Sequence, residues 1–316
     1  MNSPSINAKL KAMYAKKLKK EDLEDLMKQN NIKDAIIILK TKINNLNELP
    51  NNARRIELEN ALDNNIIDDI KKINKYLKGN DKEIWKQYIM KFKIKIIKAL
   101  YESLITKEAQ NITDTVWIDN LFLDLKPLLN AENAEDFIEQ IPNKQIKNIF
   151  KNTNSSFERE NKLDKFYLEN LLKAVRNKNK IIEKALKQKI DLLNIVWTYR
   201  CTKYYGITNQ DYLINNYYRI NKDIINEIEK AENIDELKQI LDTTIYKGVI
   251  QNDMEKDIKK FNYNINKRIF RNKTIDLSMV IGYFNMIEIE KESVITIIEG
   301  IRYKLPQIDI ERKIII

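Results

Sequence analysis

The chain has 316 residues, 43% of them hydrophobic and 32% charged, so it can bury a large core and is neither membrane-embedded nor disordered in composition. Its formal net charge is +10, which permits attraction to nucleic acid or to an anionic membrane face, but acids are interleaved with the lysines, as on solvated helix faces. It contains only 5 glycines and 5 prolines, and because both residues make turns and hairpins, this scarcity predicts an all-α fold.

The sequence lacks the residues that most catalytic and cofactor sites use. Without a histidine there is no His-based general base, no Ser–His or Cys–His pair and no imidazole metal ligand. The glycines are too widely spaced for GxxxxGK[ST] or GxGxxG, and Cys201 alone can form neither a zinc site nor an internal disulfide. We therefore expect no catalytic residue, no cofactor and no metal site, although carboxylates could still bind magnesium unaided.

Two further absences concern location. No apolar run approaches the roughly 18–20 residues that span a bilayer. The first residues, MNSPSINAKLKAMY, lack the apolar stretch of a signal peptide. A single cysteine fits a reducing compartment, so we expect a cytoplasmic protein.

Helices are predicted in chain order from apolar residues spaced three and four apart. The first hundred residues give helices at 14–27 and 30–39, a stripe from Leu58 to Leu77, and a long helix at 89–105. Later helices are predicted at 132–141, 163–174, 188–207, 232–241, 254–269 and 284–305. Breaks are expected at 44–52, Gly79 and Pro142, and links at 107–115 and at the TNQD that follows Gly206.

This series of helices repeats with a period of about 100 residues. ELENALD (57–63) recurs as ERENKLD (158–164), with a fainter version in DMEKDIKKF (253–261). A segment with an asparagine and then an acid precedes each copy, at 30–39, 132–141 and 232–241. The long helices that follow come into register when Phe92, Asp191 and Glu290 are aligned, 99 residues apart. We therefore predict three helical units, at 1–107, 108–207 and 208–316.

The recurring carboxylates have two interpretations. If the copies faced one another, Glu57, Glu59, Glu158 and Glu160 could form a metal or acid–base cluster. We favour the alternative that they are acids of the first helical turn, which complement the positive end of the helix dipole and recur because the unit recurs.

Three other groups also allow a functional and a structural interpretation. Arg200 lies within an apolar stripe, so we expect it to snorkel or to have a buried acidic partner in the same chain, although it could bind a partner protein. The series Lys91, Lys93, Lys95 and Lys98 could touch anionic lipid or nucleic acid, but we expect a solvated flank. The tyrosines of TKYYG and NNYYRI could stack on bases, but we expect them at the edge of the core.

IDLLNIVWTYRCTKYYGI (190–207) contains Asp191, Asn194, Ile195, Arg200 and Gly206, and in these residues it is similar to a segment of the C-type subunit of the A/V-type rotary ATPases. The stretch 281–305 resembles the closing helix of the family in its Tyr283, Glu288, Glu290 and Gly300, and 14–27 resembles its opening helix. Ser293, Ile295 and Lys93 depart from the residues usual there, which are Asn, Arg and Asp.

The resemblance implies a non-catalytic central-stalk subunit, equivalent to the d-type subunit of the eukaryotic V-type ATPase. In that family three similar helical units form a funnel or socket on the cytoplasmic rim of the membrane rotor ring. The funnel receives the tip of the rotor shaft (subunits of D/F type), and torque passes between ATP hydrolysis and proton or sodium transport. No small-molecule substrate and no nucleic acid are implied, and membrane contact is indirect, through the proteolipid ring.

The residues also leave two other functions open. One is a basic helical protein that binds nucleic acid or acts as an adaptor. The other is a carboxylate-dependent enzyme that uses magnesium at the four recurring glutamates.

Overall fold

The structure is a computed structural model that describes residues 3–43, 46–107, 112–207, 210–272 and 276–315. Throughout these ranges the regular secondary structure is helical, without strands, which confirms the all-α prediction. Residues 108–111 and 208–209, which belong to the two predicted links, lie outside the described residues.

In the element order, two short helices precede a pair of long ones, three times over. The first set is α2 (Lys20–Met27), α3 (Ile32–Lys42), α4 (Arg55–Asn74) and α5 (Gly79–Thr106). The second is α7 (Ala134–Gln140), α8 (Lys144–Lys151), α9 (Ser156–Val175) and α10 (Lys180–Tyr205). The third is α11 (Lys222–Lys230), α12 (Ile234–Asp242), α13 (Met254–Phe270) and α14 (Leu277–Arg302). The elements outside these sets are α1 (Ser3–Tyr14), α6 (Ile112–Leu121), α15 (Gln307–Glu311) and the 3-10 helices η2 (Leu123–Asn130) and η3 (Gln210–Tyr212).

Asparagine starts many of these helices. Asn31, Asn133 and Asn233 are the N-cap residues of α3, α7 and α12, and each side-chain oxygen accepts a backbone N–H of the first turn. Such a cap satisfies one of the donors that a helix start leaves free and stabilises the helix by about 1 kcal/mol. These are the asparagines of the recurring Asn–acid segments. Each segment begins a helix, but α7 is the first short helix of its set whereas α3 and α12 are the second of theirs.

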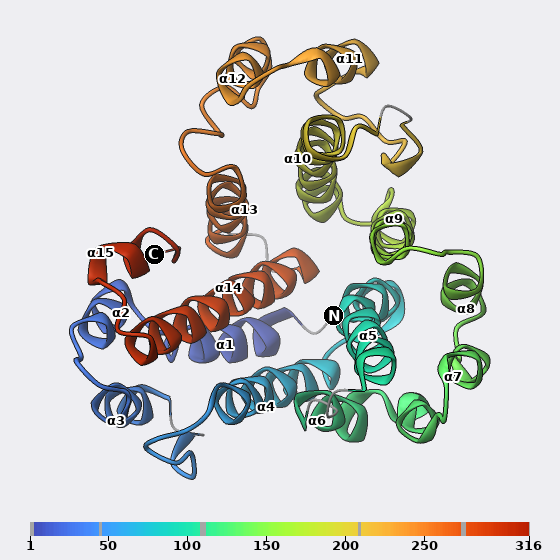
Figure 1. The fold of residues 1–316 in the computed structure, drawn as a ribbon. Coiled ribbons are helices and arrows are strands. Elements are labelled where there is room, and N and C mark those ends of the chain that lie inside the picture. Colours follow the sequence, from blue (N-terminus) through green and yellow to red (C-terminus); the bar gives the residue numbers. More distant parts are fainter. Residues whose placement is uncertain (1–2, 44–45, 108–111, 208–209, 273–275, 316) are drawn as a thin grey trace.

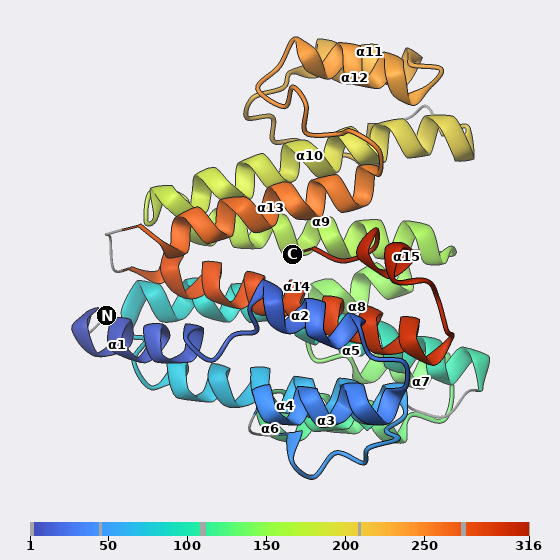
Figure 2. The ribbon, with the colours of Figure 1, turned by 90° about the vertical axis from the view of Figure 1, so that its left-hand side faces the viewer.

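The long helices, together with α6, pack into a continuous circuit of which α14 is a member (Figure 1). This helix contacts α13, α4, α2 and α3, while α5 packs on α9, α9 on α10, and α10 on α13 (Figure 1). Figure 2 shows that α5, α10 and α14 run in the same direction, so that their C-terminal ends lie toward one end of the molecule. In the described residues, no helix combines the length and the apolar composition that crossing a bilayer requires.

The buried apolar side chains form three clusters that connect distant parts of the chain. The largest includes residues from each predicted unit, among them Phe92, Leu171 and Phe284. A second joins the two ends of the chain, since Leu39 of α3 and Ile298 of α14 both belong to it. The third lies around α11 and α12. Burial of apolar surface therefore holds the N-terminal helices on the last long helix.

Candidate functional site

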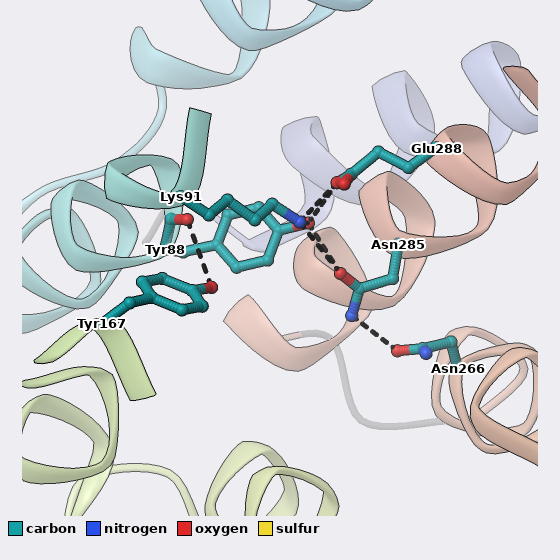
Figure 3. Close-up of polar contacts among 6 residues, drawn as sticks. All are labelled: Tyr88, Lys91, Tyr167, Asn266, Asn285 and Glu288. Atoms are coloured by element: carbon teal, nitrogen blue, oxygen red, sulfur yellow. Dashed lines mark hydrogen bonds and ion pairs between the residues drawn. The ribbon is translucent and has the colours of Figure 1, made fainter. Parts of the chain in front are cut away.

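A polar network, largely withdrawn from solvent, lies where helices of the three sets meet, and we call it the polar junction (Figure 3). Its members are Tyr88 and Lys91 of α5, Tyr167 of α9, Asn266 of α13, and Asn285 and Glu288 of α14. The side chains of α5, α13 and α14 bond to one another, and the Tyr167 hydroxyl of α9 donates to the backbone carbonyl of Tyr88 at 3.5 Å, so together they fix how the four helices are rotated against each other (Figure 3).

Hydrogen bonds connect the members in a chain. The Tyr88 hydroxyl lies 2.8 Å from Asn285 Oδ1 and 3.2 Å from Glu288 Oε1, so it can donate to either. Lys91 donates to the Tyr88 hydroxyl (2.9 Å) and forms an ion pair with Glu288. Asn285 then donates to Asn266 Oδ1 at 2.9 Å, which extends the network to α13. Polar groups that are buried together and bonded in this way are costly to separate.

Burial shifts the titration of the junction. It lowers the pKa of Lys91, and the carboxylate of Glu288 opposes this effect without cancelling it. Burial, reinforced by Glu288, raises the pKa of both Tyr88 and Tyr167, so both hydroxyls stay protonated at neutral pH. The junction therefore offers hydrogen-bond donors that are already engaged within the protein, an arrangement suited to holding helices rather than to attacking a substrate.

Helix α14 carries a second series of polar contacts toward the N-terminal helices. The Tyr283 hydroxyl donates to Asp69 of α4 at 2.7 Å. Glu290 pairs with Lys17 at 2.5 Å and accepts the backbone N–H of Leu18 at 3.1 Å. Burial alone would lower the pKa of Lys17, but Glu290 outweighs it, and the pKa lies above its usual range.

Asp191 and Asn194 of α10 hold the segment that follows η3. Asp191 is fully buried and accepts the backbone N–H groups of Tyr218 (2.9 Å) and Arg219 (2.7 Å) and the hydroxyl of Tyr246 (2.7 Å). Asn194 donates to the carbonyl of Ile214 and accepts its N–H. Burial raises the pKa of Asp191, although its three donors act in the opposite direction. Asp191 and Asn194, two of the residues on which the resemblance rests, thus form hydrogen bonds to other segments of their own chain.

Gly300 has a packing role. A Cβ at this position would lie 2.6 Å from Cδ1 and Cγ1 of Ile310, so the absence of a side chain lets α15 fold back onto α14. Ser293, one of the departures from the resemblance, donates to the carbonyls of Ile289 and Ile315 and so also supports the docking of the C-terminal segment.

The four recurring glutamates have separate partners. Glu57 pairs with Arg54 at 3.2 Å, Glu59 with Arg55 at 2.7 Å, Glu158 with Lys162 at 2.6 Å and Glu160 with Lys98 at 3.3 Å. Glu57 and Glu158 lie in the first turns of α4 and α9, which confirms the helix-start interpretation for these two. Within the described ranges, no group of three or more acids or cysteines is arranged to hold a metal ion.

Arg200 has an acidic partner in its own chain, as expected, but the pair is not buried. Its guanidinium lies 2.5 Å from Glu255 at the start of α13, and both side chains are exposed. The alternative of a buried partner was wrong, because Arg200 lies outside the buried face of α10, which continues past it to Cys201. The pair still links α10 to α13, since Glu255 lies in the first turn of that helix.

The lysine series on α5 differs from the predicted solvated flank. Lys91 is in the junction, Lys93 pairs with Asp124 and Lys98 with Glu160, so only Lys95 of the four is exposed. The prediction was wrong because α5 has neighbours on several sides, and each of the other three lysines reaches an acid on a neighbouring element.

The tyrosine prediction is confirmed in part. Tyr217 and Tyr218 of NNYYRI are half-buried, as expected for the edge of the core. Tyr204 and Tyr205 of TKYYG are instead 67% and 62% exposed, because they lie in the last turn of α10, beyond its packed part.

Sequence reasoning did not single out Tyr88, Tyr167, Asn266 and Asn285 as interacting residues. No local signal marked them, since Asn266 flanks the predicted apolar stripe and its partner Asn285 belongs to another helix, so the contact depends on how the helices assemble.

Two cavities flank α14. One of about 560 Å³ lies between α4, α5, α6 and α14 and is lined by equal numbers of basic and acidic side chains. The other, of about 280 Å³, lies between α1, α4 and α14 and is lined by six lysines and two acids over an apolar floor.

Comparison with known proteins gives a family for this chain. The family model described as the ATP synthase (C/AC39) subunit matches residues 6–313, nearly the whole length. No curated protein matches the sequence directly.

Proposed function

The chain belongs to the ATP synthase (C/AC39) subunit family of the V/A-type ATPases, and we propose that it is the central-stalk component that couples the rotor shaft to the membrane ring. The match over residues 6–313 carries this proposal. In this role the protein receives the tip of the shaft (subunits of D/F type), rests on the proteolipid ring at the cytoplasmic face, and transmits torque during proton or sodium transport.

The fold supports a mechanical role. A coupling protein has to resist rotation between its parts, and the polar junction joins α5, α9, α13 and α14 with directional bonds in addition to apolar packing. The threefold series of two short and two long helices supports the division into units 1–107, 108–207 and 208–316 and their arrangement as a funnel. A non-catalytic role is part of the same proposal.

Reconstitution tests the proposal. The chain is co-expressed with the shaft and ring subunits of its own complex, and ATP hydrolysis and ion uptake are measured in proteoliposomes with and without it. We expect the chain to bind both partners, and we expect complexes that lack it to hydrolyse ATP without ion uptake. If the chain binds neither partner at any salt concentration, or if uptake is unchanged without it, the proposal is wrong.

A further inference from the structure

The smaller cavity beside α14, which we call the α1 cavity, combines an apolar floor with a basic wall. Figure 1 shows α1 between α14 and α4, and all three helices line the cavity. Its volume of about 280 Å³ is close to the lower end of the range for small-molecule sites, about 300–1,000 Å³. Apolar side chains of the three helices form the floor: Met13, Leu62, Ile66, Ile287 and Val294.

Both acids that line the α1 cavity already have partners. Asp69 accepts the hydroxyl of Tyr283 at 2.7 Å and lies 3.0 Å from the ammonium of Lys72. Glu290 lies 2.5 Å from the ammonium of Lys17. Each acid is therefore neutralised by a lysine of the same cavity.

Two further lysines of the α1 cavity reach an acid just outside it. Lys42 lies 2.7 Å from Asp22, and Lys291 forms an ion pair with Asp63. Four of the six lysines are thus neutralised within the chain, as expected for ammonium groups that are partly withdrawn from water.

Lys9 and Lys16 are the other two lysines of the α1 cavity. In the part of the chain that the structure describes, no acid pairs with either of them. Ala12 and Met13 lie between them at helical spacing, so all four residues line the cavity from one face of α1 and the turn that follows it. Two ammonium groups without a counter-charge therefore lie beside an apolar floor.

This combination determines the kind of ligand that fits. A carboxylate or phosphate head would neutralise Lys9 and Lys16 through charge-assisted hydrogen bonds, which are the strong ones. An apolar tail would displace water from the floor, and every buried methylene adds to the affinity. An inorganic anion would leave the floor in contact with water, and an uncharged apolar molecule would leave the two ammonium groups without a partner.

We propose that the α1 cavity binds a single-chain anionic amphiphile, with its head at Lys9 and Lys16 and its tail on the apolar floor. The bound ligand touches α1, α4 and α14 at once and so holds the first helix on the other two. This inference does not depend on the coupling role, since it concerns the chain alone and holds or fails whatever partners the chain has.

The first part of the test varies the ligand. Isothermal titration calorimetry measures the binding of decanoate to the full chain, below the concentration at which decanoate forms micelles. Decanol has the same tail without the charge, and inorganic phosphate has the charge without the tail. Vesicles of phosphatidylglycerol test whether the lysines instead recognise lipid headgroups in a membrane.

The second part varies the chain. The head variant carries Lys9→Gln and Lys16→Gln, and its matched control carries Lys11→Gln and Lys33→Gln, two exposed lysines that do not line the α1 cavity. In a third variant, Ala12→Phe fills the cavity from an exposed position without removing a buried side chain. Thermal unfolding first shows that each variant is folded.

We expect decanoate to bind the wild type and the control equally and to slow hydrogen exchange in α1. The head variant and Ala12→Phe should bind it more weakly by about tenfold or more, because each loses part of the contact with the head or the tail. Decanol and phosphate should bind the wild type more weakly by a similar factor.

Several results would overturn the inference. One is that decanoate does not bind, or that decanol or phosphate binds as tightly. Another is that the head variant binds decanoate as the wild type does, or that the control loses as much affinity as the head variant. Vesicle binding that requires Lys9 and Lys16, without binding of decanoate, would assign the two lysines to a membrane surface instead.

Discussion

Lys91 on α5 forms an ion pair with Glu288 on α14, although 197 residues separate them in the chain. The pair joins the first set of helices to the last, and Tyr88 and Asn285 surround it. Both partners are largely withdrawn from solvent, with 20% and 29% of their side chains exposed. Removal of one partner of such a pair should lower the free energy of unfolding more than removal of one partner of an exposed ion pair.

The substitution Glu288→Ala leaves the ammonium of Lys91 buried without its carboxylate. We expect the free energy of unfolding to fall by about 3 kcal/mol, because an uncompensated buried charge is costly. The matched control is Asp25→Ala, which removes an exposed ion pair with Lys28 and should cost less than about 1 kcal/mol. Urea unfolding followed by circular dichroism gives both values, and equal losses would contradict the role assigned to the junction.

The substitution Asp191→Ala removes an acceptor used by two backbone N–H groups and one hydroxyl. We expect a loss of about 2–4 kcal/mol, and faster hydrogen exchange at the amides of Tyr218 and Arg219, because unsatisfied buried donors are costly. Asp191→Asn retains one acceptor oxygen and should show a smaller effect on both. Unchanged exchange at these two amides in Asp191→Ala would show that Asp191 does not hold this segment.

The substitution Gly300→Ala places a methyl group where the side chain of Ile310 lies, 2.6 Å from its nearest atoms. Since α14 is already helical there, we expect the helix to persist and α15 to be displaced, with faster exchange across Gln307–Glu311. The double variant Gly300→Ala/Ile310→Ala provides the space and should restore part of the protection. A Gly300→Ala protein with wild-type exchange in α15 would rule out this packing role.

Burial raises the pKa of Tyr212 to about 12. Because the unfolded value is about 10, the unfolded chain releases this proton first. The stabilising contribution is therefore complete below pH 10 and is lost as the pH rises through about 12. At pH 11 the loss from this group is about 1 kcal/mol, and Tyr212→Phe should show a correspondingly smaller decrease in unfolding free energy between pH 9 and pH 11. An identical decrease in the variant and the wild type would contradict the assignment.

Much of the secondary structure could be predicted because its signals are local. Apolar residues three and four apart define a helix face within a single turn, and an asparagine followed by an acid marks a helix start. Asn31, Asn133 and Asn233 show this directly, since each caps a helix in the structure as its recurrence suggested. How far a helix extends beyond the core is not recorded in local patterns, and for this reason the exposure of Tyr204 and Tyr205 was not predicted.

Local patterns in the chain were enough to predict the helical class and a period of about 100 residues, and the resemblance of three segments indicated the family that the family model then matched. Which side chains meet depended on the packing of the helices. Lys91 could be a solvated lysine or half of a buried pair, and Arg200 a buried residue or an exposed one, until α14 and α13 were placed beside them. The physical reason is one of range: helix formation depends on residues a few positions apart, whereas an ion pair between α5 and α14 depends on how distant helices pack, which no local pattern records.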